Sequence, residues 1–187
     1  MDTNSGRRRL PHFYPAHQDL FVTWHLAGSL PSGLYPPPGR RRPGEAFACM
    51  DRYLDTARTG PLWLAREDVA GAVVRELVGF ALWDLHAFAV MGNHVHALFT
   101  PGTTVSEAMK LVKGRTARTC NLLLGRSGPF WQRESYDRAV RNAEEWKRIL
   151  FYIENNPVKA GLVERPEDYQ WSSAWPGNVG LKSATAR

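Results

Sequence analysis

The feature that most constrains the fold is a pair of apolar segments, residues 84–91 and 94–100, separated by Gly92-Asn93. Each segment has the length and the apolar content of a buried strand. The Gly-Asn dipeptide suits the positive φ angles of a tight turn. We therefore expect a β-hairpin, against which the rest of the chain must pack.

Two histidines open the second strand of this hairpin. Because side chains alternate along a strand, His94 and His96 are expected on one face, with Val95, Ala97 and Phe99 on the other. Two neighbouring imidazoles can chelate one divalent metal ion, which would need further ligands from protein, water or substrate. Imidazoles are also common at partly buried positions, so the pair alone also fits a half-exposed strand.

Turn residues, helix breakers and apolar periodicity divide the remaining chain into further elements. Strands are predicted at residues 19–27 and 130–140. Helices are predicted at residues 45–58, 66–80, 103–124 and from Asn142 onwards. The last helix is expected to end near Asn156, because Pro157 disfavours helical geometry in the residue before it.

The order of these elements predicts the fold class. Without helix 45–58, interpreted as an insertion, and without the last helix, the order is strand, helix, strand, strand, helix, strand. This is the split βαβ or ferredoxin-like arrangement of the α+β class, with a four-stranded antiparallel sheet. One face of such a sheet is covered by helices, and the other is expected to stay open to a ligand. We predict one domain at residues 19–175, between a basic tail (1–18) and a disordered tail (176–187).

Composition narrows the class of protein. With 187 residues, of which 43% are hydrophobic, the chain can form a core without disulfides, and its two cysteines exclude a disulfide framework. No apolar stretch approaches the ~18 residues of a membrane span. The basic N-terminal run is not followed by an apolar signal core, so we expect a cytoplasmic protein with no membrane partner. The net charge of +6 favours an anionic partner such as nucleic acid.

Cations gather on one predicted helix and in one predicted loop. Helix 103–124 carries a row of positive charge opposite its apolar side, which suits phosphates but also occurs on solvated faces. A loop rich in Pro and Gly, from Leu30 to Gly44, adds three consecutive arginines. These cations are Lys110, Lys113, Arg115 and Arg118 on the helix, and Arg40, Arg41 and Arg42 in the loop.

The leading candidate for a nucleophile is a tyrosine. The sequence has no Gly-x-Ser-x-Gly elbow and no phosphate loop, and neither cysteine lies in a reactive motif. Tyr152 and Asn156 are four residues apart on the last helix, so their side chains share a face. They fit a nucleophile beside a third metal ligand, although Tyr152 could also dock the helix and Asn156 could cap its end. Tyr136, next to Asp137, is the competing tyrosine.

Four motifs, in the right order, resemble the REP-associated tyrosine transposases of the histidine-hydrophobic-histidine single-tyrosine transposase superfamily. The motifs are residues 91–96, 110–118, 130–137 and 152–163. The resemblance extends over roughly Asp19 to Trp175. One departure is Gly92, where the family more often has proline, and this change should loosen the hairpin without removing a ligand.

The resemblance implies a nuclease and strand transferase that acts on single-stranded DNA, often beside a hairpin of a repetitive extragenic palindrome. Tyr152 would attack a phosphodiester, giving a 5′-phosphotyrosine and a free 3′-OH. His94 and His96 would hold Mg²⁺ or Mn²⁺ on the scissile phosphate, with Asn156 as a third ligand. The four cations of helix 103–124 would contact phosphates. The resemblance does not cover the arginine loop, which we expect to bind DNA as well. The protein would be bacterial, cytoplasmic and nucleoid-associated, as a monomer or homodimer.

Two other classes of function stay open at this point. One is a non-catalytic nucleic-acid-binding module, because the same topology serves domains whose sheet aromatics stack on bases. That class predicts aromatic pairs on central strands, where this chain has His94 and His96. The other is a metal-dependent hydrolase that activates water, in which Tyr152 is structural.

Overall fold

The structure, a computed structural model, describes residues 14–15, 17–30, 43–56 and 60–178. Four strands form one antiparallel sheet in the order β2-β3-β1-β4, and four helices pack around it. The predicted α+β class is therefore confirmed. The elements are β1 (Leu20–His25), α1 (Pro43–Thr56), α2 (Glu67–Gly79), β2 (Trp83–Val90), β3 (His94–Pro101), α3 (Val105–Leu123), β4 (Tyr136–Ala139) and α4 (Ala143–Lys159).

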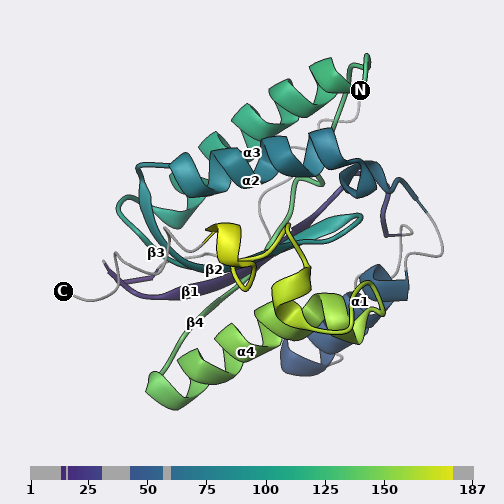
Figure 1. The fold of residues 1–187 in the computed structure, drawn as a ribbon. Coiled ribbons are helices and arrows are strands. Elements are labelled where there is room, and N and C mark those ends of the chain that lie inside the picture. Colours follow the sequence, from purple (N-terminus) through teal and green to yellow (C-terminus); the bar gives the residue numbers. More distant parts are fainter. Residues whose placement is uncertain (1–13, 16, 31–42, 57–59, 179–187) are drawn as a thin grey trace.

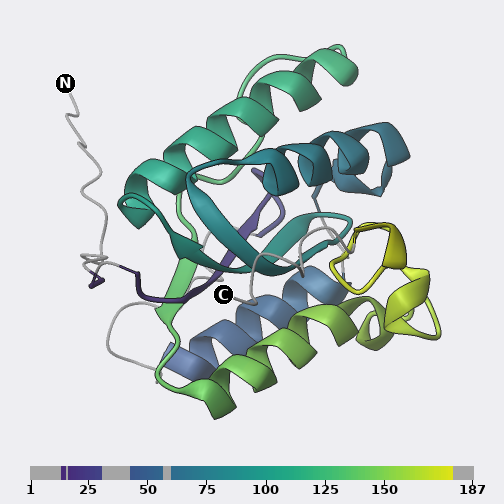
Figure 2. The same cartoon turned by 60° about the vertical axis from the view of Figure 1, so that its left-hand side comes forward.

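The molecule has three layers, with the sheet in the middle (Figures 1 and 2). Helices α2 and α3 cover one face, where alternate sheet residues such as Val22, Val95 and Phe99 form the main core. Helices α1 and α4 lie on the other face, against a second cluster that includes Phe21 and Ile153. The expectation of one open sheet face is therefore wrong, because α1 and the last helix cover it. Among the described residues, no helix is long and apolar enough to cross a membrane.

The predicted hairpin is present, but its turn differs from the prediction. Neither Gly92 nor Asn93 has a positive φ. The Met91 N–H donates to the His94 carbonyl at 2.8 Å, and the rest of the chain holds the turn in place. The Leu26 N–H donates to the Asn93 carbonyl at 2.8 Å, and the Leu64 N–H donates to the Gly92 carbonyl at 3.2 Å. Tertiary hydrogen bonds thus determine the turn conformation in place of the left-handed geometry that the dipeptide permits.

The strand predicted at residues 130–140 is shorter than expected. Only Tyr136–Ala139 pairs with β1, apart from one isolated bridge between Leu26 and Trp131. The intervening carbonyls of Gln132 and Arg133 accept hydrogen bonds from Lys113 Nζ at 2.6 and 3.0 Å. A lysine of α3 therefore satisfies backbone groups that a strand neighbour would otherwise have paired.

Helix α4 continues past the proline that was expected to end it. Asn156 and Pro157 are both buried helical residues, and the helix runs on to Lys159. Hydrogen bonds resume beyond the ring, since the Ala160 N–H donates to the Asn156 carbonyl at 2.9 Å. Burial of this turn outweighs the local preference of the residue before proline. The predicted position of the helix end was wrong by three residues.

The start of α4 is fixed to the sheet by a buried carboxylate. The Asn142 side chain caps the helix by accepting from the Glu145 N–H at 2.8 Å. The Glu145 carboxylate, only 5% exposed, accepts hydrogen bonds from Arg138 of β4 and from Arg141 Nε, the latter at 2.9 Å. Hydrogen bonds from Arg141 lower the pKa of Glu145 to about 2.

This ion-pair cluster predicts a specific acid sensitivity. The folded pKa of Glu145 lies below its ordinary 4.5, so its stabilisation is complete above pH 4.5 and is lost as pH falls toward about 2. Urea unfolding across this window should show a smaller loss of stability in Glu145→Gln than in the unchanged protein. The control Glu144→Gln alters an exposed neighbour and should follow the unchanged protein. Parallel curves for all three proteins would contradict the assignment.

Candidate metal and tyrosine site

The two histidines of β3 are buried and held in defined orientations. His94 is 1% exposed and His96 is fully buried, on the sheet face opposite Val95. His94 Nδ1 lies 2.6 Å from the Asn93 side-chain oxygen, and His96 Nδ1 lies 2.7 Å from the Thr23 hydroxyl. Because an amide oxygen only accepts, His94 Nδ1 carries the proton and Nε2 keeps its lone pair. Each ring is thus fixed through its Nδ1 atom and directs its Nε2 atom into the site.

The two presented nitrogens point at each other. His94 Nε2 and His96 Nε2 are 3.0 Å apart. Burial, and then the neighbouring His96, keep the pKa of His94 well below its ordinary 6.5, so this imidazole is neutral. A lone pair that faces another nitrogen needs a proton or a metal cation between the two atoms. The pair therefore has the form of a chelating site.

Two carboxylates reach the same point from α1. Asp51 Oδ1 lies 3.3 Å from His96 Nε2, and Asp55 Oδ1 lies 3.8 Å from His94 Nε2. The other oxygen of each carboxylate accepts from Lys159 Nζ of α4, at 3.0 Å for Asp51 and 2.7 Å for Asp55. Each carboxylate is thereby shared between a fixed cation and the histidines.

Sequence reasoning missed these three charged residues. The sequence pattern predicts helix 45–58 as an insertion and indicates no role for its polar side. The available signal was the spacing of Asp51 and Asp55, which places two carboxylates on one face of a helix. Their distance in sequence from the histidines gave no indication that the faces would meet. Lys159 was missed because the helix was expected to end before it.

Helix α4 brings the predicted tyrosine and asparagine to the histidines. Asn156 is fully buried, and its Nδ2 lies 3.1 Å from His96 Nε2. The Tyr152 ring centroid is 5.5 Å from that of His96. Burial, and then the charge of Asp51, raise the pKa of the Tyr152 hydroxyl far above its ordinary value. The structure thus gathers all four predicted residues that were assigned to metal and nucleophile.

The donors at this point fit a divalent metal ion. One ligand atom each of Asp51, His94 and His96 lies within 4.8 Å of the others, and all three residues are buried. Asn156 Oδ1 is buried with no hydrogen-bond partner, so turning its amide group would offer a fourth donor. Neutral imidazoles and a carboxylate suit first-row divalent ions. This Asp-His-His group could therefore bind a metal.

The predicted phosphate contacts lie on the other layer. Lys110, Lys113, Arg115 and Arg118 belong to α3, which covers the sheet face that the histidines do not occupy. Lys113 holds the loop before β4, and Arg115 NH1 pairs with Glu76 at 3.1 Å. Contact of these four cations with DNA stays a prediction. Arg40, Arg41 and Arg42 lie outside the described residues, as do most residues of the two predicted tails.

Comparison with known proteins connects this geometry to one group of enzymes. The sequence profile of the family described as transposase IS200-like matches residues 65–156. Within this segment, the chain is similar to the IS200-like transposases. The matched segment contains His94, His96, Tyr152 and Asn156, whereas α1 with its two carboxylates lies outside it.

One protein is similar in sequence and one solved structure is similar in fold. A REP-associated tyrosine transposase of Escherichia coli (strain K12) is 26% identical over 94 residues, which cover 49% of this chain and 54% of that protein. The match thus spans about half the length of the relative. A solved structure of a REP-associated tyrosine transposase bound to a REP hairpin is similar in fold, with a TM-score of 0.58. That likeness has 18% identity and covers 93% of this chain and 86% of the other. The predicted resemblance to this group is confirmed.

Metal binding predicts a shift in thermal stability. An ion that binds only the folded state at 100 times its Kd adds about 2.7 kcal/mol, or roughly 5–10 °C in unfolding temperature. Saturating Mn²⁺ should produce this shift in the unchanged protein and lose most of it in His96→Ala and Asp51→Asn. The control Asp168→Asn removes an exposed carboxylate that pairs with Arg165, and should keep the shift. An equal shift in every variant would place the ion elsewhere.

Proposed function

We propose that this chain is a metal-dependent endonuclease and strand transferase for single-stranded DNA, with Tyr152 as its nucleophile. The observation that carries the proposal is the convergence of Tyr152 with His94, His96 and Asp51 at one buried point. The relation to IS200-like transposases supports the same chemistry. Because the similar solved structure is that of a transposase bound to a REP hairpin, we propose hairpin-forming palindromic DNA as the partner.

The proposed reaction conserves the phosphodiester. The Tyr152 oxygen forms a bond to phosphorus as the bond from phosphorus to the 3′ oxygen breaks. The tyrosine proton passes to water, and the 3′ oxygen leaves and takes up a proton from water as a free 3′-OH. The phosphate stays bonded to the 5′ oxygen of the downstream strand and to the tyrosine. Attack by a 3′-OH on this phosphotyrosine reverses the step and joins strands. A covalent intermediate of this kind needs no nucleotide energy source.

The buried polar groups have defined tasks in this proposal. His94, His96 and Asp51 would hold Mg²⁺ or Mn²⁺, with Asn156 as a further ligand. The bound ion would polarise the scissile phosphate and offset the charge of Asp51 that opposes ionisation of Tyr152. Lys159 would hold Asp51 and Asp55 in place by binding one oxygen of each. Thr23 and Asn93 would maintain the orientation of the two imidazoles.

The fold argues against the non-catalytic alternative. A binding module that stacks bases on its sheet needs an open sheet face, and here helices cover both faces. The hydrolase alternative uses the same metal ligands and differs only in the nucleophile. The experiment that separates it from the proposal must therefore detect the bond to tyrosine.

A covalent adduct is the predicted outcome of the decisive assay. Labelled single-stranded DNA with a palindromic hairpin, incubated with the protein and Mn²⁺, should give a complex that survives denaturant. Tyr152→Phe should give none, and Tyr136→Phe, which removes the competing hydroxyl, should retain it. Cleavage that persists in Tyr152→Phe would instead support activated water, and loss of the adduct only in Tyr136→Phe would transfer the role to that tyrosine.

Asp51 gives a second prediction for the same assay. Asp51→Asn removes a ligand charge, so the rate of adduct formation at limiting Mn²⁺ should fall by about 10- to 100-fold and recover in part at higher Mn²⁺. Chelation by EDTA should abolish adduct formation in every variant. If the Asp51→Asn rate is independent of metal concentration, Asp51 acts on Tyr152 or on the fold and not on the ion.

A further inference from the structure

A cavity of about 300 Å³ adjoins Tyr152. It lies between β4, the first half of α4 and the first turns of α1, since Tyr136, Ile149 and Phe47 all line it. Its volume is at the lower end of the range for small-ligand pockets. The cavity has room for one planar group with its substituents and is too small for a duplex.

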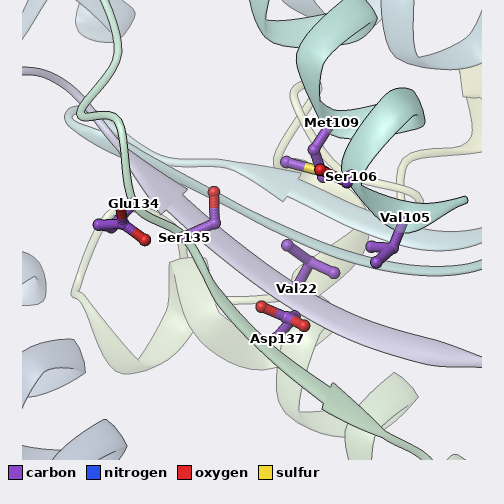
Figure 3. A pocket seen from close by; sticks show the side chains of 7 residues that line it. All are labelled: Val22, Val105, Ser106, Met109, Glu134, Ser135 and Asp137. Carbon is purple, nitrogen blue, oxygen red and sulfur yellow. The ribbon is translucent and has the colours of Figure 1, made fainter. Parts of the chain in front are cut away.

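A second cavity does not compete with it. Figure 3 shows that cavity between β1, the start of α3 and the segment that leads into β4, with Glu134 and Ser135 on one side and Met109 on the other. Its volume of about 20 Å³ holds about one water molecule. Of these two cavities, the one beside the tyrosine has space for a ligand.

Aromatic rings form the inner part of the large cavity. Phe47 and Tyr136 have ring centroids 4.5 Å apart with planes inclined by 32°. Phe21 meets Tyr152 edge to face, with centroids 5.9 Å apart. Aromatic side chains bind nucleobases of any sequence by stacking, because every base has a π-face.

Guanidinium groups form the outer part. Arg138 and Arg141 share the buried Glu145 carboxylate, and their side chains are 39% and 68% exposed. Arg148 is exposed and has no carboxylate partner among the residues that the structure describes. Three guanidiniums and one carboxylate leave two positive charges at the cavity. Glu145 orients two of these groups, and free N–H donors remain for phosphate oxygens.

We propose that this cavity is a subsite for one unstacked nucleotide of single-stranded DNA, adjacent to the bond that Tyr152 attacks. The base would lie against the rings of Phe47 and Tyr136, and its phosphate would lie against Arg148 and its neighbours. Tyr152 lines the cavity and also contacts His96, so the nucleotide would be next to the scissile phosphate. The position of this nucleotide next to the reacting bond rests on the proposed function. The binding of a nucleotide in the cavity does not depend on it.

Binding of two strands that differ only in their bases tests the subsite. In a Tyr152→Phe background, which cannot form the adduct, fluorescence anisotropy would compare oligothymidylate with a fully abasic strand of equal length. The parent should bind oligothymidylate at least about tenfold more tightly. Tyr136→Ala should abolish this preference, whereas Tyr136→Phe, which keeps the ring, should retain it. Trp175→Ala, which removes a partly exposed aromatic outside the cavity, should also retain it.

The arginine part of the subsite has a separate test that does not depend on substitution of a ring. Arg148→Gln changes one exposed side chain and should weaken binding of both strands by the same factor, with a shallower dependence on salt. The matched control Arg75→Gln, an exposed arginine of α2 on the opposite layer, should leave both unchanged.

The outcomes separate this proposal from the proposed function. A base preference that persists in Tyr136→Ala, or an absence of preference in the parent, would overturn the subsite. An Arg148→Gln protein that matches the parent in affinity and salt dependence would overturn the phosphate contact. If Tyr136→Ala fails to unfold cooperatively, Phe47→Ala takes its place with the same expectation. Failure of the proposed function would appear instead as an absence of the covalent adduct in the protein with Tyr152 intact. The binding measurements use Tyr152→Phe proteins and are independent of that result.

Discussion

The approach of His94 Nε2 to His96 Nε2 is the contact on which the other parts of the site depend. The 3.0 Å separation follows from the strand, which places residues two apart on one face, and from the two oxygens that fix the far side of each ring. One of these oxygens belongs to Thr23 on the neighbouring strand. The pairing of Thr23 with His96 in the sheet register therefore determines the direction of an imidazole. A change in register would move the Thr23 hydroxyl away from His96 and leave that ring without the partner that orients it.

The second requirement is the presence of α1 on the histidine face. This helix supplies Asp51 and Asp55, and Lys159 joins both carboxylates to α4. Burial raises the pKa of Asp55, whereas contact with His96, Tyr152 and Lys159 outweighs burial and lowers the pKa of Asp51. The two neighbouring carboxyl groups therefore differ, and Asp51 is the one that stays ionised beside the histidines. Negative charge at that position attracts a cation and disfavours ionisation of Tyr152, so the two groups depend on each other.

Much of this organisation could be predicted from the sequence because local patterns encode it. The hairpin, the shared face of His94 and His96, and the i, i+4 pair of Tyr152 and Asn156 all follow from the repeat of a strand or helix. The errors arose where contacts between distant segments prevailed. Pro157 remains helical because its turn is buried, and the strand before Tyr136 is replaced by hydrogen bonds to Lys113. Asp51 was missed because no local pattern indicates which layer an inserted helix will cover.

The continuation of α4 through Pro157 has a mechanical consequence. Tyr152, Asn156 and Lys159 occupy successive turns of one helix, so the proposed nucleophile, the proposed metal ligand and the cation that binds α1 move together. Displacing the tyrosine from the histidines by movement of that helix would also withdraw the amide and break both bridges to α1. The tyrosine could move without Asn156 and Lys159 only if the helix unfolded between them. The three side chains therefore reach the histidines and α1 together or leave them together. Arrangements with only two of the three in place are disfavoured.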